Sequence, residues 1–184
     1  MENLQNYRQV RPNRGLAFFR GFLRHPDLVG SVIPSSRFLE RRLIDAAVVE
    51  QARLVVELGP GTGGTTRALL DALPADSKLL AIEINHEFAS LLRTEPDPRL
   101  IVHHGSAEHL PQALALHGLS EPDVVISGIP FSTMPVTLGR RILGSVWSSL
   151  RPGGHGLLAS SGQRLHHGPR LRQLSHALLA PGRD

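Results

Sequence analysis

A glycine cluster flanked by two carboxylates is the part of the sequence whose residue types and spacing best suit ligand chemistry. Gly59, Gly61 and Gly64 match the pattern G-x-G-x-x-G directly after an apolar segment. A nucleoside-triphosphate loop would need G-K-[ST] here, and the sequence has none. Glu57, two residues before the first glycine, would repel a pyrophosphate but attract a cation. Glu83 ends a second apolar segment, where its carboxylate can accept hydrogen bonds from a ribose diol.

These residues together describe a site for a cation that carries a ribose and no phosphate. S-adenosylmethionine fits that description, and S-adenosylhomocysteine would be the product left after methyl transfer. The alternative interpretation is that the glycines only form turns. We expect S-adenosylmethionine as the cofactor.

Alternating strand and helix patterns surround the cluster and predict how it is positioned. Short apolar runs indicate strands, and apolar residues at helical spacing lie between them. Thr65 and Thr66 are candidate caps of the first helix. This alternation favours an α/β fold with a mainly parallel sheet flanked by helices, in which ligands bind at the carboxyl ends of the strands. The predicted strands are 54–59, 78–84, 99–106, 123–129 and 154–160, and the predicted helices are 64–73, 86–93, 110–119 and 135–150.

Three segments resemble motifs of the Rossmann-like class I methyltransferases: "VVELGPGTGGTTRALL", "LLAIEIN" and "VHHGSAEHL". The resemblance implies that the glycine turn approaches the amino-acid end of S-adenosylmethionine, that the acid after the second strand binds the ribose, and that the third segment contacts adenine. Relatives often carry Asp at the position of Ser106, and Glu108 is a second candidate for the adenine contact. The implied cofactor-binding residues are Glu57, Gly59, Pro60, Gly61, Thr62, Gly63, Glu83, Ile84, Ser106, Ala107 and Glu108.

The segment after the fourth predicted strand, "SGIPF", lies where amine methyltransferases carry a motif similar to N/D-P-P-Y/F. The resemblance implies that Ser127, Gly128, Ile129, Pro130 and Phe131 form the catalytic site for the methyl acceptor. A polar group or carbonyl would orient the amine, Pro130 would fix the loop, and Phe131 would face the developing ammonium. The alternative is that Phe131 belongs to the core. We name no general base, because displacement at a sulfonium depends mainly on alignment and desolvation.

A more specific resemblance joins residues 18–43 to the segment "SGIPFSTMP". Both are similar to bacterial phospholipid N-methyltransferases, which act on phosphatidylethanolamine and are themselves similar to ribosomal RNA adenine dimethylases. The resemblance covers about residues 18–154 and implies N-methylation of a phospholipid headgroup amine. Two alternatives stay open: N6-methylation of adenine in RNA, and a catalytically weak module that binds the cofactor or a membrane.

The charge pattern favours an anionic membrane surface as partner. The formal net charge is +4 and the isoelectric point is about 10.8. Arginines interleave with phenylalanines between residues 8 and 24, which suits an interfacial helix, although an ordinary amphipathic helix packed on the sheet would show the same pattern. Nucleic acid is the less favoured partner because stacking aromatics are few. No signal-peptide pattern or spanning stretch is present, so we expect a cytoplasmic, peripheral membrane protein.

The composition also sets domain limits and excludes some chemistry. Cysteine is absent, and the ten histidines lack the H-E-x-x-H spacing, so we expect no metal site. We divide the chain into an N-terminal helical segment at 1–45, which covers the cofactor and offers the membrane contact, a cofactor-binding core at 46–162 and an atypical tail at 163–184.

The tail departs from the usual ending of the class I fold, which is a hairpin of two further strands. After Ala159 the sequence contains no Val, Ile, Phe, Tyr, Trp or Met. We therefore expect the C-terminal strands to be missing, with a sheet of about five strands, the fifth near an open edge that invites a homo-oligomer. A short helix is predicted after Pro169.

Overall fold

The computed structural model describes residues 49–131, 134–158 and 163–166, the last four without their side chains. The predicted N-terminal helical segment and the predicted helix after Pro169 lie outside these residues. The described elements are η2 (Val49–Gln51), β1 (Leu54–Leu58), α3 (Gly64–Ala72), β2 (Lys78–Glu83), α4 (His86–Leu92), β3 (Leu100–His104), η3 (Ala107–His109), α5 (Leu110–Leu116), β4 (Val124–Ser127), α6 (Val136–Ser149), β5 (His155–Leu158) and β6 (Gln163–His166).

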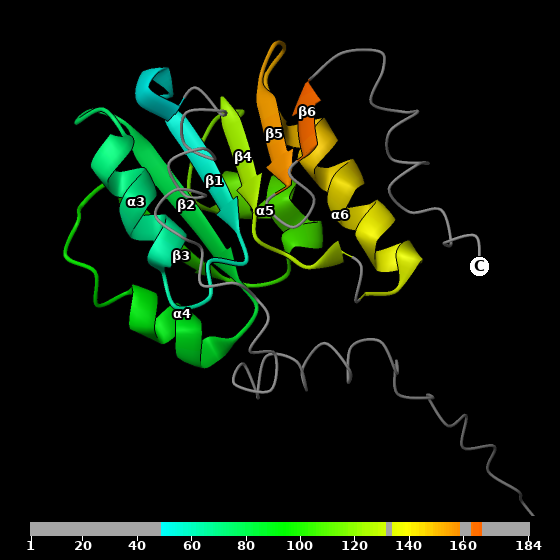
Figure 1. Cartoon of the computed structure of the whole chain (residues 1–184), viewed down its shortest axis with the longest axis horizontal. Coiled ribbons are helices and arrows are strands. Elements are labelled where there is room, and N and C mark those ends of the chain that lie inside the picture. The colour runs from blue at the N-terminus through cyan, green and yellow to red at the C-terminus, as the bar shows by residue number, and fades with distance from the viewer. Residues whose placement is uncertain (1–48, 132–133, 159–162, 167–184) are drawn as a thin grey trace, which may run out of the picture.

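One sheet organises the described residues, with the strand order β3-β2-β1-β4-β5-β6 (Figure 1). Strands β1 to β5 pair in parallel with their neighbours, and β6 is antiparallel to β5. The order reverses between β1 and β4, which is the switch point where open α/β sheets bind ligands. The strands and helices predicted from the sequence are present within a few residues of their expected limits.

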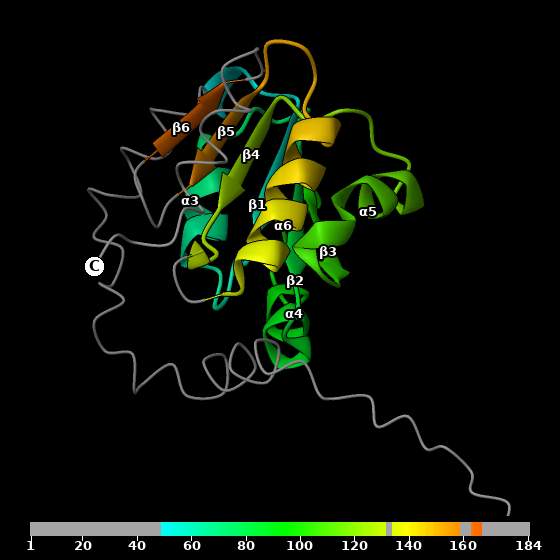
Figure 2. The same cartoon turned by 90° about the vertical axis from the view of Figure 1, so that its right-hand side faces the viewer.

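Helices cover both faces of the sheet, because its strands are apolar on both sides. Val56 and Leu58 of β1 belong to the core cluster that includes residues of α5 and α6. Val55, on the opposite side of the same strand, belongs to the cluster that includes α3 and η2. Figure 2 shows α6 and α5 on one side of the strands and α3 on the other. The alternation places Glu57 on the same side as Val55, facing α3.

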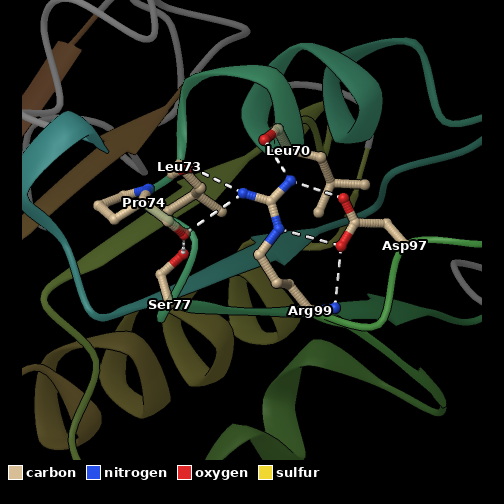
Figure 3. Close-up of polar contacts among 6 residues, drawn as sticks. All are labelled: Leu70, Leu73, Pro74, Ser77, Asp97 and Arg99. Carbon is tan, nitrogen blue, oxygen red and sulfur yellow. Dashed lines mark hydrogen bonds and ion pairs between the residues drawn. The ribbon is translucent and has the colours of Figure 1, made fainter.

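An arginine at the amino end of β3 fastens the end of α3 to the sheet (Figure 3). Arg99 donates from one guanidinium nitrogen to the carbonyl of Leu70 at 2.7 Å and from another to the carbonyl of Leu73 at 2.7 Å. Asp97 holds the same guanidinium through Nε at 3.0 Å and Nη2 at 2.6 Å. The last carbonyls of a helix lack partners within the helix, so Arg99 acts as its side-chain cap.

A carboxylate at the start of β4 makes a second such fastening. Asp123 Oδ2 accepts the backbone N–H groups of Arg53 and Leu54 at 2.8 and 2.9 Å, and Oδ1 accepts Nε of Arg151. These bonds lower the pKa of Asp123 against the effect of its burial. The start of β1, the start of β4 and the segment after α6 are thereby held together at the amino ends of the strands.

The prediction that the tail contributes no strand is wrong for Gln163–His166, which form β6. Its register pairs Leu158 with Gln163 and His155 with His166. Pairing satisfies the backbone groups of β5 and β6 that face each other, and this outweighs the poor strand propensity of the tail sequence. Strand β5 is therefore covered rather than at the edge. The predicted homo-oligomer loses that edge as its basis and is otherwise untested.

Candidate functional site

The candidate site lies where the carboxyl ends of the parallel strands meet, beside the switch point of the sheet (Figure 1). The glycine turn follows β1, and Glu83 is the last residue of β2. Ser106–Glu108 follow β3, and Ser127 ends β4 before the predicted acceptor loop. Parallel pairing aligns these ends, so all four segments predicted from the sequence border one edge.

Three glycines with positive φ give the turn after β1 its shape. Gly59, Gly61 and Gly63 have φ of 71°, 57° and 84°. A Cβ at Gly59 would lie 2.9 Å from Cγ1 of Ile129, so this position needs glycine for packing as well as for backbone conformation. A Cβ at Gly61 would meet nothing within 4 Å, which leaves that side of the turn open for a ligand to approach the backbone.

Glu83 fixes the turn to the end of β2. Its Oε2 accepts the N–H of Gly61 at 3.0 Å, and its Oε1 accepts the N–H of Asn85 at 2.8 Å. The residue is only 2% exposed. A carboxylate offers about four acceptor positions, so two remain for the hydroxyls of a diol. The structure thus brings Glu83 and the turn together as the sequence predicts, and Asn85 additionally caps α4 through Oδ1.

Glu57 lies beneath the turn and is held by α3. Thr66 donates its hydroxyl to Glu57 Oε2 at 2.6 Å, and both residues are buried. Burial raises the pKa of Glu57 to about 7, the hydroxyl of Thr66 opposes this, and the nearby charge of Glu83 adds to it. The prediction of Thr65 and Thr66 as caps of this helix is wrong, because Gly63 occupies the N-cap position without a side-chain bond. The hydroxyl of Thr66 binds Glu57 instead.

The loop after β4 crosses closely over the glycine turn. The N–H of Gly128 donates to the carbonyl of Leu58 at 2.9 Å, and a Cβ at Gly128 would lie 3.0 Å from the carbonyl oxygen of Gly59. Ser127 is buried, and its Oγ accepts the N–H of Ile129 at 3.3 Å. Ser127 and Gly128 therefore shape the loop, and Ile129 contributes its backbone because its side chain is buried.

Pro130 and Phe131 are half-buried at the outer end of this loop. Phe131 packs against the small cluster formed by Leu143 and Leu158. Phe131 therefore makes core contacts, as the alternative interpretation expects, and the exposed part of its ring remains available to a substrate.

The segment after β3 has a polar network of its own. Ser106 is the N-cap of η3, with its Oγ 3.4 Å from the N–H of Glu108 and 3.3 Å from Oε1 of Glu108. Ala107 is buried, and Ile84 is half-buried, with its carbonyl 3.2 Å from Nε2 of His104. Arg141 of α6 donates from Nε to Glu108 Oε2 at 2.7 Å. Nothing in the sequence pattern singles out Arg141, since it comes from a distant helix.

A protein-family model described as "Methyltransferase domain" matches residues 55–154. The ornithine lipid N-methyltransferase of Singulisphaera acidiphila is 34% identical over 139 residues, which are 74% of this chain and 72% of that protein. Two proteins named ribosomal RNA small subunit methyltransferase A are also similar. That of Laribacter hongkongensis is 34% identical over 54% of this chain and 40% of its own length, and that of Leifsonia xyli subsp. xyli is 35% identical over 70% and 45%.

Solved structures with the same fold include two methyltransferases. The N-methyltransferase NodS of Bradyrhizobium japonicum, in complex with S-adenosylhomocysteine, has a TM-score of 0.61 at 14% identity and covers 91% of this chain and 84% of its own. The O-methyltransferase TomG of Streptomyces achromogenes, in complex with S-adenosylmethionine, has a TM-score of 0.55 at 22% identity and covers 82% and 66%. Identities this low show a common fold, and the predicted fold class is confirmed.

Proposed function

This chain belongs to the family of S-adenosylmethionine-dependent methyltransferases, and we propose that it transfers the methyl group to the amine of a lipid headgroup. The similarity to the ornithine lipid N-methyltransferase carries the proposal. An alignment over 74% of the chain must include its central part, where the glycine turn and the loop after β4 lie. The similarity to that protein thus extends over both the glycine turn and the loop after β4.

The residues at the carboxyl edge suit this cofactor. Two buried carboxylates, Glu57 and Glu83, favour a cationic ligand, and the open side of Gly61 allows close approach to the backbone. Glu83 would receive the ribose hydroxyls and the turn would hold the amino-acid end. When bound, S-adenosylmethionine supplies a methyl group on a sulfonium, which needs no further activation.

The chain's own contribution to transfer is alignment of the acceptor amine. The loop after β4 is fixed by Ser127 and by the bond from Gly128 to β1, so the carbonyls of Gly128 and Ile129 stand in a preformed arrangement. Carbonyl oxygens can accept hydrogens of a neutral amine and direct its lone pair. The exposed part of Phe131 would stabilise the ammonium that forms as the methyl group is transferred.

Phosphatidylethanolamine and ornithine lipid both present a primary amine close to an anionic group. The test incubates the full chain and radiolabelled S-adenosylmethionine with vesicles of phosphatidylcholine that contain either lipid, and separately with unmethylated small ribosomal subunits. We expect label in one or both lipids, and Glu83→Ala should remove it. Label confined to RNA would contradict the proposal.

Methylation of adenine in RNA is the second candidate, favoured by the similarity to the two ribosomal RNA methyltransferases. This chain spans less than half of each of those proteins, whereas it spans most of the lipid enzyme. The ribosomal arm of the assay decides between the two.

We further propose that the lipid is met at an anionic membrane surface through the basic segment at residues 8–24, which lies outside the described residues. The support is the arginine–phenylalanine pattern in the sequence. Among the described helices, none combines the length and the apolar character that crossing a bilayer requires. Co-sedimentation with anionic vesicles should weaken in high salt and when Arg20 and Arg24 are replaced by alanine. Equal binding to neutral and anionic vesicles would count against this contact.

A further inference from the structure

Helix α6 borders the loop that carries the proposed acceptor site. Phe131 of this loop packs against Leu143 and Leu158, a buried pair that comes from α6 and the end of β5. Trp147, one turn further along α6, packs against the same pair. The side of α6 that carries Leu143 and Trp147 therefore lies next to Phe131.

Arg140 is exposed and lies on this same side of α6, one turn closer to the start of the helix. It precedes Leu143 by three positions and Trp147 by seven, and residues at these spacings share one face of a helix. Helix side chains lean towards the helix N-terminus. Because α6 begins at the carboxyl edge of the sheet, where the loop after β4 leads into it, the guanidinium of Arg140 extends towards the acceptor loop (Figure 1).

The charge of Arg140 has no carboxylate partner among the described residues. Arg141, although next in the sequence, points to another side of α6, where it bonds Glu108. The helix itself contains no acidic residue. Aspartates or glutamates form ion pairs instead with Arg67, Arg99, Arg141 and Arg151. Arg140 therefore brings to the acceptor side a positive charge that no described side chain neutralises.

The acceptor lipids of the proposed function supply the matching charge. Phosphatidylethanolamine carries a phosphate and ornithine lipid a carboxylate, each joined to the primary amine by a short carbon chain. A guanidinium binds either group through two parallel hydrogen bonds. An anion held at Arg140 leaves the amine free to reach the loop after β4, whose carbonyls orient it.

We propose that Arg140 binds the anionic group of the acceptor lipid, a phosphate or a carboxylate, and so selects amines that have such a neighbour. Arg140 is then a specificity-determining residue for the headgroup, whereas the loop after β4 acts on the amine itself. This inference rests on the proposed function.

The test measures methyl transfer by the full chain to three lipids in micelles of a nonionic detergent, which removes the charge of a membrane surface. The lipids are phosphatidylethanolamine, ornithine lipid and a dialkylglycerol analogue in which an amine replaces the free hydroxyl group, so that no anion is present. Arg140→Ala should lower kcat/KM about tenfold, mainly through KM, for one or both of the lipids that carry an anion. Activity on the analogue should not fall, and Arg140→Lys should restore part of the loss.

Arg53→Ala is the matched control, because it removes the same charge from another exposed arginine, which precedes β1 at the opposite edge of the sheet. Its kcat/KM should equal that of the wild type for every lipid. Calorimetry should give Arg140→Ala the affinity of the wild type for S-adenosylhomocysteine, which shows that the variant is folded. A loss with phosphatidylethanolamine alone assigns the phosphate to Arg140, and a loss with ornithine lipid alone assigns the carboxylate.

Equal losses on all three lipids, no loss on any lipid, or the same loss in Arg53→Ala overturn this inference. Weaker binding of S-adenosylhomocysteine to Arg140→Ala also overturns it, because the residue would then act on the cofactor site. If the wild type methylates none of the lipids, the result counts against the proposed function itself. The two failures are therefore distinguishable.

Discussion

Replacing Glu57 by glutamine should make the protein more stable at neutral pH and leave its stability in acid little changed. The folded protein raises the pKa of this carboxyl from 4.5 to about 7, chiefly by burial. A raised pKa means that the fold favours the protonated form. The contribution of Glu57 to stability is therefore complete below about pH 4.5 and decreases as the pH rises to about 7, because the unfolded chain ionises first.

The size of the effect follows from the shift in pKa. One pKa unit corresponds to about 1.4 kcal/mol, so the shift to about 7 predicts a loss of about 3 kcal/mol between pH 4.5 and pH 7. Glutamine does not ionise, and its carbonyl oxygen can still accept the hydroxyl of Thr66. The variant should therefore exceed the wild type by about 3 kcal/mol at pH 8 and match it near pH 4.5.

Urea unfolding of both proteins at several pH values measures this difference. Subtracting one curve from the other cancels groups common to both, including Asp97, Glu108 and Asp123, whose lowered pKa values make stability fall in acid. A difference between the two proteins that does not change with pH would refute the reasoning about burial.

The same carboxylate should influence cofactor affinity in the opposite sense. A cationic ligand favours ionised Glu57, so binding of S-adenosylmethionine should strengthen about tenfold between pH 6 and pH 8 in the wild type. The Glu57→Gln variant should show a shallower dependence and weaker binding at pH 8. If the affinity of the wild type and of the Glu57→Gln variant depended on pH in the same way, the charge of Glu57 would not affect cofactor binding.

Three other substitutions separate binding from stability. Glu83→Ala should weaken S-adenosylhomocysteine binding more than tenfold in calorimetry, because each lost hydrogen bond to a charged acceptor is worth about 1.5–3 kcal/mol; unchanged affinity would remove Glu83 from the site. Gly59→Ala should lower the urea midpoint of unfolding more than Gly61→Ala, since both residues have positive φ but only a Cβ at Gly59 meets a side chain, at 2.9 Å. Gly61→Ala should impair cofactor binding more, because that side of the turn is open to the ligand. The reverse order in either measurement would contradict these roles of the two glycines. Arg99→Ala should lower the free energy of unfolding in urea by about 1–3 kcal/mol, because the cap of α3 is lost. Arg67→Ala, which removes an exposed ion pair, should lower it by less than about 1 kcal/mol. Similar losses for the two variants would argue against the cap.

The central fold and its ligand edge could be predicted because their signals are local. Apolar runs of strand length alternate with helical patterns, and parallel pairing then brings the strand ends to one edge. The glycines after β1 have positive φ values, which glycine adopts more readily than other residues, so their spacing in the sequence predicts the turn. The family match confirms the predicted enzyme class and cofactor. The individual roles assigned to the site residues stay predictions.

What the sequence could not reveal depends on tertiary contacts rather than on local patterns. Thr66 is a residue type that often caps helices, yet its hydroxyl donates a hydrogen bond to Glu57 of the preceding strand β1. Arg141 reaches Glu108 across 33 positions, and no periodicity predicts such a pair. Strand β6 forms from residues with little strand propensity because β5 offers it a partner. In each case tertiary contacts override a local preference.

The bonds that fasten helices and strands together and the turns that admit the ligand lie at opposite ends of the sheet. At the amino ends of the strands, Arg99 and Asp123 tie helix ends and strand starts together through side-chain bonds to backbone groups. At the carboxyl ends the chain uses glycine turns, and there Glu83 and Ser127 bond to the backbone of the turns themselves. Glycines carry no side chains that could hold these loops, so the carboxylate of Glu83 and the hydroxyl of Ser127 take over that role. A variant that weakens the amino-end fastenings should therefore lower stability with little effect on the intrinsic affinity for the cofactor, whereas loss of Glu83 should affect both.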